Sequence, residues 1–349
     1  MSKEIGNKRS TIKDIARLTG FSIATISRVI NNKGVFYSKD TYEKIVSAAK
    51  SLNYYPDAIA RGLKTKKTYN IAFLVPKTSE FYSEIFLGIQ DAASLSGYSV
   101  AMYSSKVDLK QEERNIEVIL SNRLDGMIIA TLLLDQKNFE SISMSGIPVV
   151  TIEKFLKNED VPSIKIKNRE ISKKAVEYLI SLGHKKIGFI SEPLNIGKIE
   201  SRLRGYKDAL SGAGIDYDES LVFINESLAE EIFDVCYEYI KSIFSKKINL
   251  SAIFTSTDVV AISAIKALSD LGYKIPEDIS IIGFDGLEIT KYTNPSLTTV
   301  IQPRYEMGRE AMKLLLNILN GQPASSIDLK AKLEIRNSTI QINSRQINT

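Results

Sequence analysis

The sequence feature that most constrains the fold is an alternation of short apolar runs with helical patterns, which begins at Tyr69 and continues almost to the end of the chain. Residues 70–75 read NIAFLV, residues 79–97 show the apolar period of a helix, and residues 98–105 return to a strand pattern. Strands joined by helices in this way pair in parallel, and helices then cover both faces of the sheet. Residues 69–349 are therefore expected to form an α/β core with parallel sheets.

The alternation restarts once, which predicts two lobes of similar size. The first series of strands and helices ends with a strand at residues 147–152, and a crossover is expected near residues 161–167. The last segments predict that the chain returns to the first lobe and then to the second, with a cleft between the lobes. The expected boundaries place residues 69–166 and 297–324 in the N-lobe and residues 167–296 and 325–349 in the C-lobe.

Ahead of this core, residues 11–32 predict a helix-turn-helix. Thr11 is placed to cap a first short helix, Gly20 to end it, and Ser22 to cap a second. The apolar positions at helical spacing are Ile12, Ile15, Ala16 and Leu18 on the first helix and Ile26, Val29 and Ile30 on the second. The opposite face of the second helix is left for DNA, because a recognition helix enters the major groove with its first turns. The early positions on that face are Ile23, Ala24, Thr25, Ser27 and Arg28.

Two amphipathic helices with a glycine between them are also common in ordinary cores, and the distribution of charge favours the DNA-binding alternative. Residues 1–68 carry 14 Lys and Arg against 5 Asp and Glu, whereas residues 69–349 carry 32 against 36. Positive charge concentrated around a helix-turn-helix is typical of phosphate binding. A third helix at residues 39–52 completes an all-α head over residues 1–55.

A hinge helix and linker are expected at residues 56–68. Pro56 breaks the preceding helix, Asp57 can cap a new one, and the helical pattern up to Leu63 is barely two turns long. A helix this short is unstable alone in water, so it is expected to fold only on binding DNA. The lysines at positions 64, 66 and 67 either lie near phosphates or form a solvated spacer.

Composition argues against several classes of protein. No apolar run approaches the length of a membrane span, and MSKEIGNKRS lacks the apolar region of a signal peptide, so a cytoplasmic protein is expected. The single cysteine, Cys236, is expected to be a buried structural thiol, and the single histidine, His184, a loop or capping residue. No metal site, cofactor or enzyme activity is predicted, because histidine pairs, cysteine clusters and a GxxxxGKS or GxxxxGKT phosphate loop are all missing from the sequence.

Several motifs resemble those of the LacI/GalR family of bacterial transcription regulators, over nearly the whole chain. They are TIKDIARLTGFSIATISRVIN at residues 11–31, LNYYPDAIARGL at 52–63, RLRGYKDAL at 202–210, IIGFDG at 281–286 and NPSLTTVIQP at 294–303. The resemblance implies a core like a periplasmic sugar-binding protein and two subunits that together read a palindromic operator in double-stranded DNA. The tail has no leucine heptads, so a homodimer is expected.

The resemblance assigns DNA contacts residue by residue. It implies that Ile23, Ala24 and Arg28 touch bases in the major groove, whereas Thr25, Ser27 and Asn31 lie near the backbone or support it. Leu63 matches a leucine that wedges between base steps in the minor groove, and Ala60 packs beside it. The two caps, Thr11 and Ser22, are included among the expected DNA-binding residues.

The resemblance also implies an effector site in the cleft. Phe81 and Tyr82 match aromatics that stack on a ligand, although at a helix start they are equally explained as packing residues. Arg202 matches an arginine that grips hydroxyls or a carboxylate, and Asp285 an acid that accepts hydroxyl hydrogen bonds; a salt bridge is the alternative for both. Further candidates, each just past a strand end, are Glu153 and Asp258. Residues 225–227 read NES where relatives often present an aromatic, which disfavours a purine or disaccharide stacked there.

The predicted function is a transcription regulator, in the first place a repressor, controlled by a small effector expected to be a sugar or sugar derivative. The effector is expected to shift the population of lobe arrangements and thereby operator affinity. One alternative is a global carbon-catabolite regulator whose corepressor, a phosphorylated carrier protein, docks on residues 305–317. Two rivals from other classes are a solute-binding protein, which would need an export signal, and a sugar kinase fused to a DNA-binding head, which would need a phosphate loop.

Overall fold

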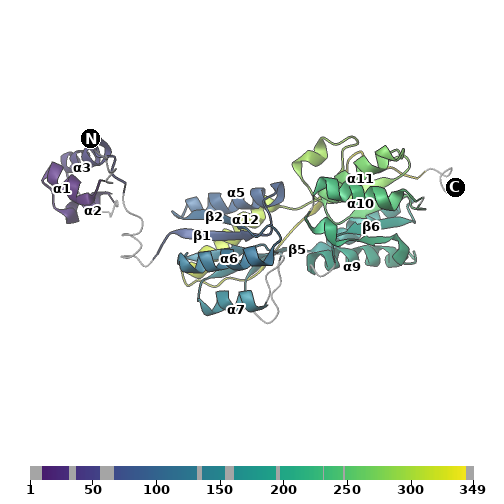
Figure 1. The fold of residues 1–349 in the computed structure, drawn as a ribbon, viewed down its shortest axis with the longest axis horizontal. Helices are drawn as coiled ribbons and strands as arrows, with labels where there is room; N and C mark the ends of the chain where they lie inside the picture. The colour runs from purple at the N-terminus through teal and green to yellow at the C-terminus, as the bar shows by residue number, and fades with distance from the viewer. Residues whose placement is uncertain are drawn as a thin grey trace, which may run out of the picture. The chain divides into compact units, whose positions relative to one another are not determined.

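The computed structural model describes residues 10–30, 37–55, 67–131, 136–153, 161–193, 197–230, 232–246 and 248–342. The chain divides into two compact units, a head at residues 1–68 and a core at residues 69–349 (Figure 1). Three residues predicted to contact DNA, Asn31, Ala60 and Leu63, lie outside the described residues, as does the predicted hinge helix.

The head contains the three predicted helices, α1 (Ile12–Thr19), α2 (Ile23–Ile30) and α3 (Lys39–Ser51). Its small core is made of the buried side chains Ile15, Ile26, Val29, Ile45 and Ala48. Leu18 was expected on the buried face of α1 and is 60% exposed. On this short helix Ile15 alone is fully buried, and Leu18 lies at the edge of the face that Ile15 centres.

The first lobe of the core is built on a six-stranded sheet in the order β11-β5-β4-β3-β1-β2. The strands are β1 (Asn70–Val75), β2 (Ser99–Ser104), β3 (Gly126–Ile129), β4 (Val149–Ile152), β5 (Ser163–Ile166) and β11 (Ile327–Leu329). In β1, Ile71, Phe73 and Val75 face one hydrophobic layer, whereas Ala72 and Leu74 face the other. Both faces are therefore covered, as the apolar run at residues 70–75 predicts.

Two pairs of helices supply those layers. Helices α5 (Glu80–Ser94) and α12 (Arg304–Leu319) pack on one face, and α6 (Leu109–Ser121) and α7 (Gln136–Met144) on the other (Figure 1). Helices α5 and α12 cross at two glycines. A Cβ atom on Gly308 would lie 1.9 Å from the Ile85 carbonyl oxygen, and one on Gly88 would lie 2.0 Å from the Tyr305 carbonyl oxygen. The close approach of these two backbones therefore requires glycine at both positions.

The second lobe has the same architecture, with a sheet in the order β12-β10-β9-β8-β6-β7. The strands are β6 (Ile187–Ser191), β7 (Val222–Ile224), β8 (Ala252–Thr255), β9 (Ser280–Asp285), β10 (Thr298–Ile301) and β12 (Lys332–Glu334). Helices α8 (Asn168–Ser181) and α9 (Gly197–Gly212) cover one face, and α10 (Phe233–Phe244) and α11 (Asp258–Asp270) the other. Three short 3₁₀ helices complete the lobe, η1 (Glu219–Leu221), η2 (Glu226–Glu230) and η3 (Glu288–Lys291).

The lobe boundaries differ from those expected. Strand β10, placed in the N-lobe by the sequence, pairs in parallel with β9 in the second sheet, with Thr298 opposite Ile282. Strand β11, placed in the C-lobe, pairs in parallel with β5 in the first sheet. The chain therefore crosses between lobes after β5, after β10 and after β11. A run of apolar residues predicts a strand, but the partner of that strand depends on contacts far away in the sequence.

Two residues singled out by the sequence are buried in the second lobe. Cys236 is fully buried on α10, as expected of a structural thiol. His184 is 2% exposed, and its Nε2 lies 3.1 Å from the Ile340 carbonyl oxygen, so this histidine fastens the C-terminal segment to the lobe. No helix within the described ranges is long and apolar enough to cross a membrane.

Candidate functional site

The helix-turn-helix is held by local side-chain caps. The Asp14 carboxylate accepts hydrogen bonds from the Thr11 N–H at 2.9 Å and from the Thr11 hydroxyl at 2.7 Å, which fixes the start of α1. The Ser22 Oγ accepts from the Thr25 N–H at 3.1 Å at the start of α2. Thr11 and Ser22 therefore cap the two helices as predicted, and both are exposed.

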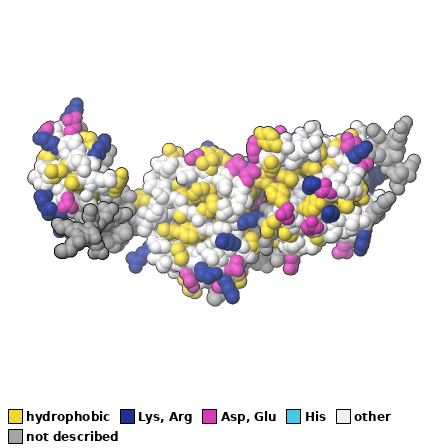
Figure 2. Space-filling model, turned by 45° about the horizontal axis from the view of Figure 1, so that its top comes forward, with side chains coloured by type: hydrophobic (Ala, Val, Ile, Leu, Met, Phe, Trp, Pro, Cys, Tyr) yellow, Lys and Arg dark blue, Asp and Glu magenta, His cyan; other side chains and the backbone are white. Residues whose placement is uncertain are grey.

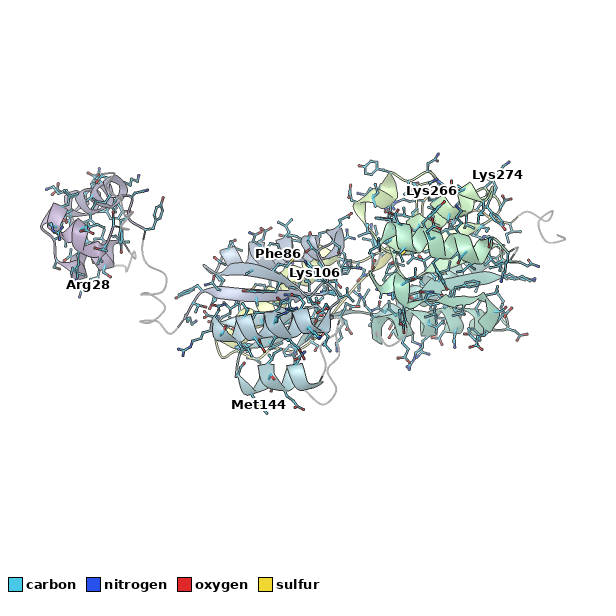
Figure 3. All side chains as sticks on the ribbon, in the orientation of Figure 1. Arg28, Phe86, Lys106, Met144, Lys266 and Lys274 are labelled. Atoms are coloured by element: carbon cyan, nitrogen blue, oxygen red, sulfur yellow. The ribbon has the colours of Figure 1, made fainter. Side chains whose placement is uncertain are left out.

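The outer face of α2 is exposed in the pattern expected of a recognition helix. Ile23, Ala24 and Arg28 are exposed, whereas Thr25 and Ser27 are half-buried. Arg28 has no ion-pair partner in the described part of the chain and extends from the surface of the head (Figure 3). Ile23 is 46% exposed, so its apolar side chain is accessible on this face. The view in Figure 2 shows Lys and Arg side chains on the surface of the head.

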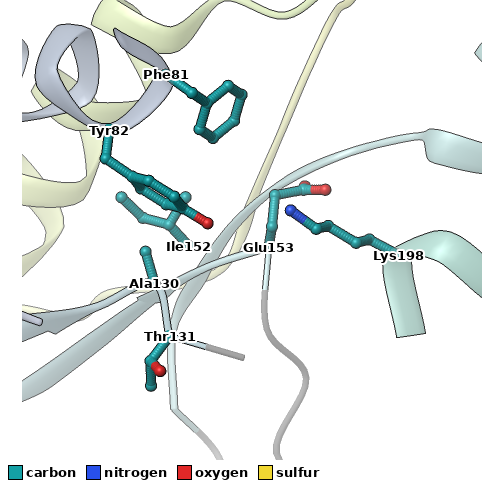
Figure 4. Close-up of a pocket in the computed structure, with 7 residues that line it drawn as sticks. All are labelled: Phe81, Tyr82, Ala130, Thr131, Ile152, Glu153 and Lys198. Atoms are coloured by element: carbon teal, nitrogen blue, oxygen red, sulfur yellow. The ribbon is translucent and has the colours of Figure 1, made fainter. Parts of the chain in front are cut away.

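In the core, a pocket lies between the two lobes (Figure 4). Phe81 and Tyr82 come from the first turn of α5, and Lys198 comes from the first turn of α9. The remaining lining residues lie at or just past the carboxyl ends of β3 and β4, where parallel sheets usually bind ligands. They are Ala130, Thr131, Ile152 and Glu153.

The two aromatic side chains form the apolar wall of this pocket. The rings of Phe81 and Tyr82 are 5.1 Å apart between centroids, with an interplanar angle of 82°. Both are more than nine-tenths buried and belong to the hydrophobic core, so they pack at the helix start and line the pocket together. The Lys198 Nζ lies 5.7 Å from the Phe81 centroid. The sequence offered two explanations for Phe81 and Tyr82, packing at a helix start and contact with a ligand. The positions of the two rings are compatible with both.

Glu153 is fixed by groups at the lobe crossover. One carboxylate oxygen accepts from the Ile166 N–H at 2.6 Å and the other from the Asn168 side-chain amide at 2.5 Å. Burial raises the pKa of this carboxyl group, and the two hydrogen bonds and the charges of Lys198 and Arg202 partly oppose that rise. Glu153 also has a φ of 55°, in the left-handed region. The carboxylate is thus held in one orientation at the edge of the pocket.

Asn168 continues the network to Arg202. The Arg202 Nε donates to the Asn168 side-chain oxygen at 3.0 Å, and its Nη1 donates to the Ser256 carbonyl oxygen. The guanidinium carbon lies 3.6 Å from the centroid of the Phe284 ring. Arg202 is fully buried, and among the described residues its Nη2 has no hydrogen-bond partner.

The two predicted aspartates have different surroundings. The Asp285 Oδ1 lies 3.9 Å from the Arg202 Nη1 and accepts from the Gln302 side-chain amide at 2.6 Å. Asp258 is fully buried, accepts from the Thr299 hydroxyl at 2.5 Å and the Leu287 N–H at 2.8 Å, and burial raises its pKa to about 6. The structure therefore brings Arg202 and Asp285 together, but neither they nor Asp258 are among the residues that line the pocket. Both oxygens of Asp258 hold the second lobe together.

Three residues at this junction were missed by the sequence analysis. Thr131 follows the carboxyl end of β3, the same signal that identified Glu153, whereas Lys198 on α9 lies beyond any strand end. Arg304, at the start of α12, is 5% exposed and binds across the lobes. Its Nε donates to Glu84 on α5 at 2.6 Å, and its Nη1 donates to the Asp285 carbonyl oxygen at 2.8 Å. No local pattern marks an arginine at a helix start as such a bridge.

Within the described segments, no group of three or more His, Cys, Asp or Glu side chains is placed to hold a metal ion. The residues that line the pocket carry two aromatic rings, the hydroxyls of Tyr82 and Thr131, one fixed carboxylate and one lysine. This arrangement suits the binding of a polar ligand with an apolar face, with few side chains positioned for acid–base chemistry.

Known proteins share both parts of this architecture. The family model for bacterial regulatory proteins of the lacI family matches residues 11–57, and that for a periplasmic binding protein-like domain matches residues 176–339. The catabolite control protein A of Priestia megaterium is 32% identical over 337 residues, which cover 94% of this chain and 99% of that protein. The chain belongs to the LacI family of bacterial regulatory proteins. The resemblance inferred from the motifs is therefore confirmed.

Solved structures of transcription regulators agree with the fold. The CelR–cellobiose complex is similar with a TM-score of 0.71 and 27% identity, covering 95% of this chain and all of that chain. The lac repressor dimer bound to operator and an anti-inducer is similar with a TM-score of 0.83. The match covers 95% of this chain and all of that chain, and at 24% sequence identity it supports the fold alone. The predicted fold, a helical head with a two-lobed periplasmic-binding-like core, is confirmed. As a family member, the chain is a DNA-binding transcription regulator.

Proposed function

We propose that the chain is a repressor that reads a palindromic operator as a homodimer, and that a carbohydrate bound between its lobes sets its affinity for DNA. The observation that carries this proposal is the pocket lined from both lobes, by Phe81, Tyr82 and Glu153 on one side and Lys198 on the other. A ligand that touches both lobes favours one arrangement of the lobes over another, which is the requirement for a population shift. The cellobiose in a similar solved structure supports a carbohydrate.

The relatives are named as regulators, so the chain is proposed to bind its carbohydrate without converting it. It is proposed to act in the cytoplasm, where operators are found. Arg28, Ile23 and Ala24 are proposed to touch bases, because they lie on the exposed face of α2. Thr25, Ser27 and Asn31 at the backbone, and Ala60 and Leu63 in the minor groove, stay predictions.

The test is a selection of operator DNA followed by titration. The full chain would select palindromic sites from a random DNA pool, and fluorescence anisotropy would measure its dissociation constant for the enriched site with and without a panel of carbohydrates. A carbohydrate that binds the core is expected to change that constant by about 5- to 150-fold. Failure to enrich a palindrome, or a DNA affinity that no carbohydrate alters, would overturn the proposal.

A second candidate is suggested by the name of the relative from Priestia megaterium, a catabolite control protein. In that case a phosphorylated carrier protein would dock on residues 305–317 of α12. The apolar residues of α12 pack against α5 and the first sheet, so lobe packing accounts for their spacing. Pull-down of the full chain with a phosphorylated and an unphosphorylated carrier protein separates the two candidates, since only the phosphorylated form should bind under this alternative.

A further inference from the structure

We propose that Glu80 and Arg304 form a latch between the two lobes, and that this latch keeps the ligand-free chain in the closed arrangement, in which Glu80 contacts the second lobe. The lobes are joined covalently where the chain crosses between them, whereas the contacts of the latch can break and form again. The latch acts in the chain without any ligand, so it goes beyond the proposed function and does not depend on what the ligand is.

Glu80 reaches the second lobe from the start of α5, of which it is the first residue. One of its carboxylate oxygens accepts a hydrogen bond at 2.5 Å from the N–H of Glu288, the first residue of η3. The two residues are 208 positions apart in the sequence and belong to different lobes, so this bond exists only while the lobes are together. A hydrogen bond to an ionised acceptor is stronger than one between neutral groups.

The second lobe holds the donor of this bond in place. The N–H of the preceding residue, Leu287, donates to the Asp258 carboxylate at 2.8 Å, and Asp258 is fully buried. The Thr290 N–H donates to the Leu287 carbonyl oxygen at 3.1 Å, which closes the turn. The Glu288 N–H is therefore presented by a fixed turn, so the bond to Glu80 forms without the entropic cost of ordering a loop.

Arg304 makes the second half of the latch. Its Nε donates to Glu84 at 2.6 Å, and its Nη1 donates to the Asp285 carbonyl oxygen at 2.8 Å. Its Nη2 lies 3.8 Å from the same Glu80 oxygen that accepts from the second lobe. Glu80 and Glu84 are one turn apart on α5, whereas Asp285 ends β9 in the second sheet. One buried guanidinium therefore joins two acidic groups of the first lobe to the backbone of the second.

The acidic half of the latch is accessible to water. The Glu80 side chain is 42% exposed and that of Glu84 is 40% exposed. Water can replace the protein donors of such groups, so each contact is expected to change the ratio of closed to open arrangements by only about tenfold. Contacts of this strength bias an equilibrium between arrangements and still allow it to shift.

The latch and the pocket share one turn of helix. Phe81 and Tyr82, which form the apolar wall of the pocket, directly follow Glu80. The guanidinium carbon of Arg304 lies 6.0 Å from the centroid of the Phe81 ring. Breaking the latch therefore separates the aromatic wall from Lys198, which lines the same pocket from the second lobe. A ligand that touches both walls would oppose this separation.

Distances between spin labels on the two lobes test the latch in the full chain. Glu117→Cys on α6 and Ser211→Cys on α9 supply one exposed attachment site in each lobe, whereas the native Cys236 is fully buried. Labelled chain is mixed with an excess of unlabelled chain, so that each measured distance lies within one copy. Pulsed electron paramagnetic resonance then gives the distribution of distances without ligand, and circular dichroism verifies that each variant is folded.

Matched variants separate the latch from general effects. Glu80→Ala and Arg304→Met should each lower the ratio of closed to open chains by about tenfold, and the combined variant should lower it further. Glu80→Gln keeps an oxygen that can accept from the Glu288 N–H but lacks the charge, so it should fall between wild type and Glu80→Ala. Glu170→Ala is the control, since Glu170 is an exposed acid in the first turn of α8 and pairs with Lys167 at 3.1 Å.

The distance distributions decide the outcome. A second distance that grows in Glu80→Ala and Arg304→Met, predominates in the combined variant and stays at the wild-type level in Glu170→Ala supports the latch. An unchanged distribution in the combined variant overturns it, because the lobes then keep their arrangement without these contacts. A wild-type chain in which the second distance already predominates also overturns it. The carbohydrate effector is tested separately, by the operator titration.

Discussion

At the residue scale, Arg28 is the side chain from which the largest effect on DNA recognition is expected. It is exposed on α2 and has no competing ion pair in the described part of the head. Arg28→Ala should weaken binding to the selected operator by about 1–3 kcal/mol, roughly 5- to 150-fold, because a bidentate contact to guanine would be lost. Anisotropy titration measures this loss, with Lys44→Ala on α3 as a charge-matched control. Equal losses in both variants would show that Arg28 contributes only charge.

Arg304 is expected to stabilise the junction between the lobes. Arg304→Met removes the donor to Glu84 and to the Asp285 carbonyl oxygen, and should lower the unfolding free energy by about 2–3 kcal/mol. Urea denaturation of the full chain measures this change. Arg309→Met on the same helix breaks ion pairs of a side chain that is 42% exposed, and should leave stability nearly unchanged. Similar losses in both variants would mean that the bridge is unimportant.

His184 gives stability a defined dependence on pH. Its Nε2 must donate to the Ile340 carbonyl oxygen, so Nδ1 accepts from the Ser251 hydroxyl, and burial lowers the pKa of the ring below 6.5. Below pH 6.5 the unfolded chain takes up a proton that the folded chain resists, so stability falls as the pH falls. His184→Gln keeps a donor but does not titrate. The stability difference between wild type and this variant should therefore shrink from pH 7.5 to 5.5; parallel curves would contradict the assignment.

Individual residues of the pocket were predictable where strand ends mark them. Glu153 was found because it follows a strand end at the carboxyl edge of the first sheet, whereas Phe81 and Tyr82 were expected from the family resemblance. Lys198 and Arg304 could not be found in this way, because their roles depend on how the two lobes approach each other. Asp258 satisfies the same strand-end pattern as Glu153 but is used to fix the turn at residues 286–287.

At the element scale, the crossing of α5 and α12 depends on Gly308. Gly308→Ala should lower the unfolding free energy by about 1–3 kcal/mol, because its Cβ would collide with the Ile85 carbonyl oxygen and the helices must move apart. Replacing glycine by alanine inside a helix would by itself stabilise the protein by about 1 kcal/mol. The collision is expected to outweigh this gain.

The control for this prediction is Gly212→Ala at the end of α9, where an added Cβ meets nothing within 4 Å. Its stability should be unchanged or slightly raised. Urea denaturation followed by circular dichroism compares the two variants. If Gly308→Ala proved as stable as Gly212→Ala, the prediction that the close approach of α5 and α12 requires glycine at position 308 would be wrong.

The existence of most elements could be predicted, but the pairing of the closing strands could not. Residues 70–75 and 280–285 are apolar throughout and became central parallel strands, as their composition requires. The three-residue strands β7, β11 and β12 are too short to show a period of two, and β10 looks the same whichever sheet it joins. Strand pairing over such distances is decided by tertiary contacts.

At the scale of the whole molecule, two sites in separate units of the chain are expected to be coupled. The head carries the positive charge and the exposed face of α2, whereas the core carries a pocket whose walls come from both lobes. Charge distribution and motif order made this division predictable from the sequence. The direction of the coupling, release or retention of DNA, depends on which lobe arrangement binds the operator, and sequence alone does not specify it.

The most direct test of this coupling is a reciprocal titration with the full chain. The operator dissociation constant is measured with and without a carbohydrate that binds the core, and the carbohydrate dissociation constant is measured with and without operator. Both constants are expected to change by the same factor, about 5- to 150-fold, because linkage requires reciprocity. A carbohydrate that binds the core while leaving the operator dissociation constant unchanged would show that the pocket between the lobes does not control DNA binding.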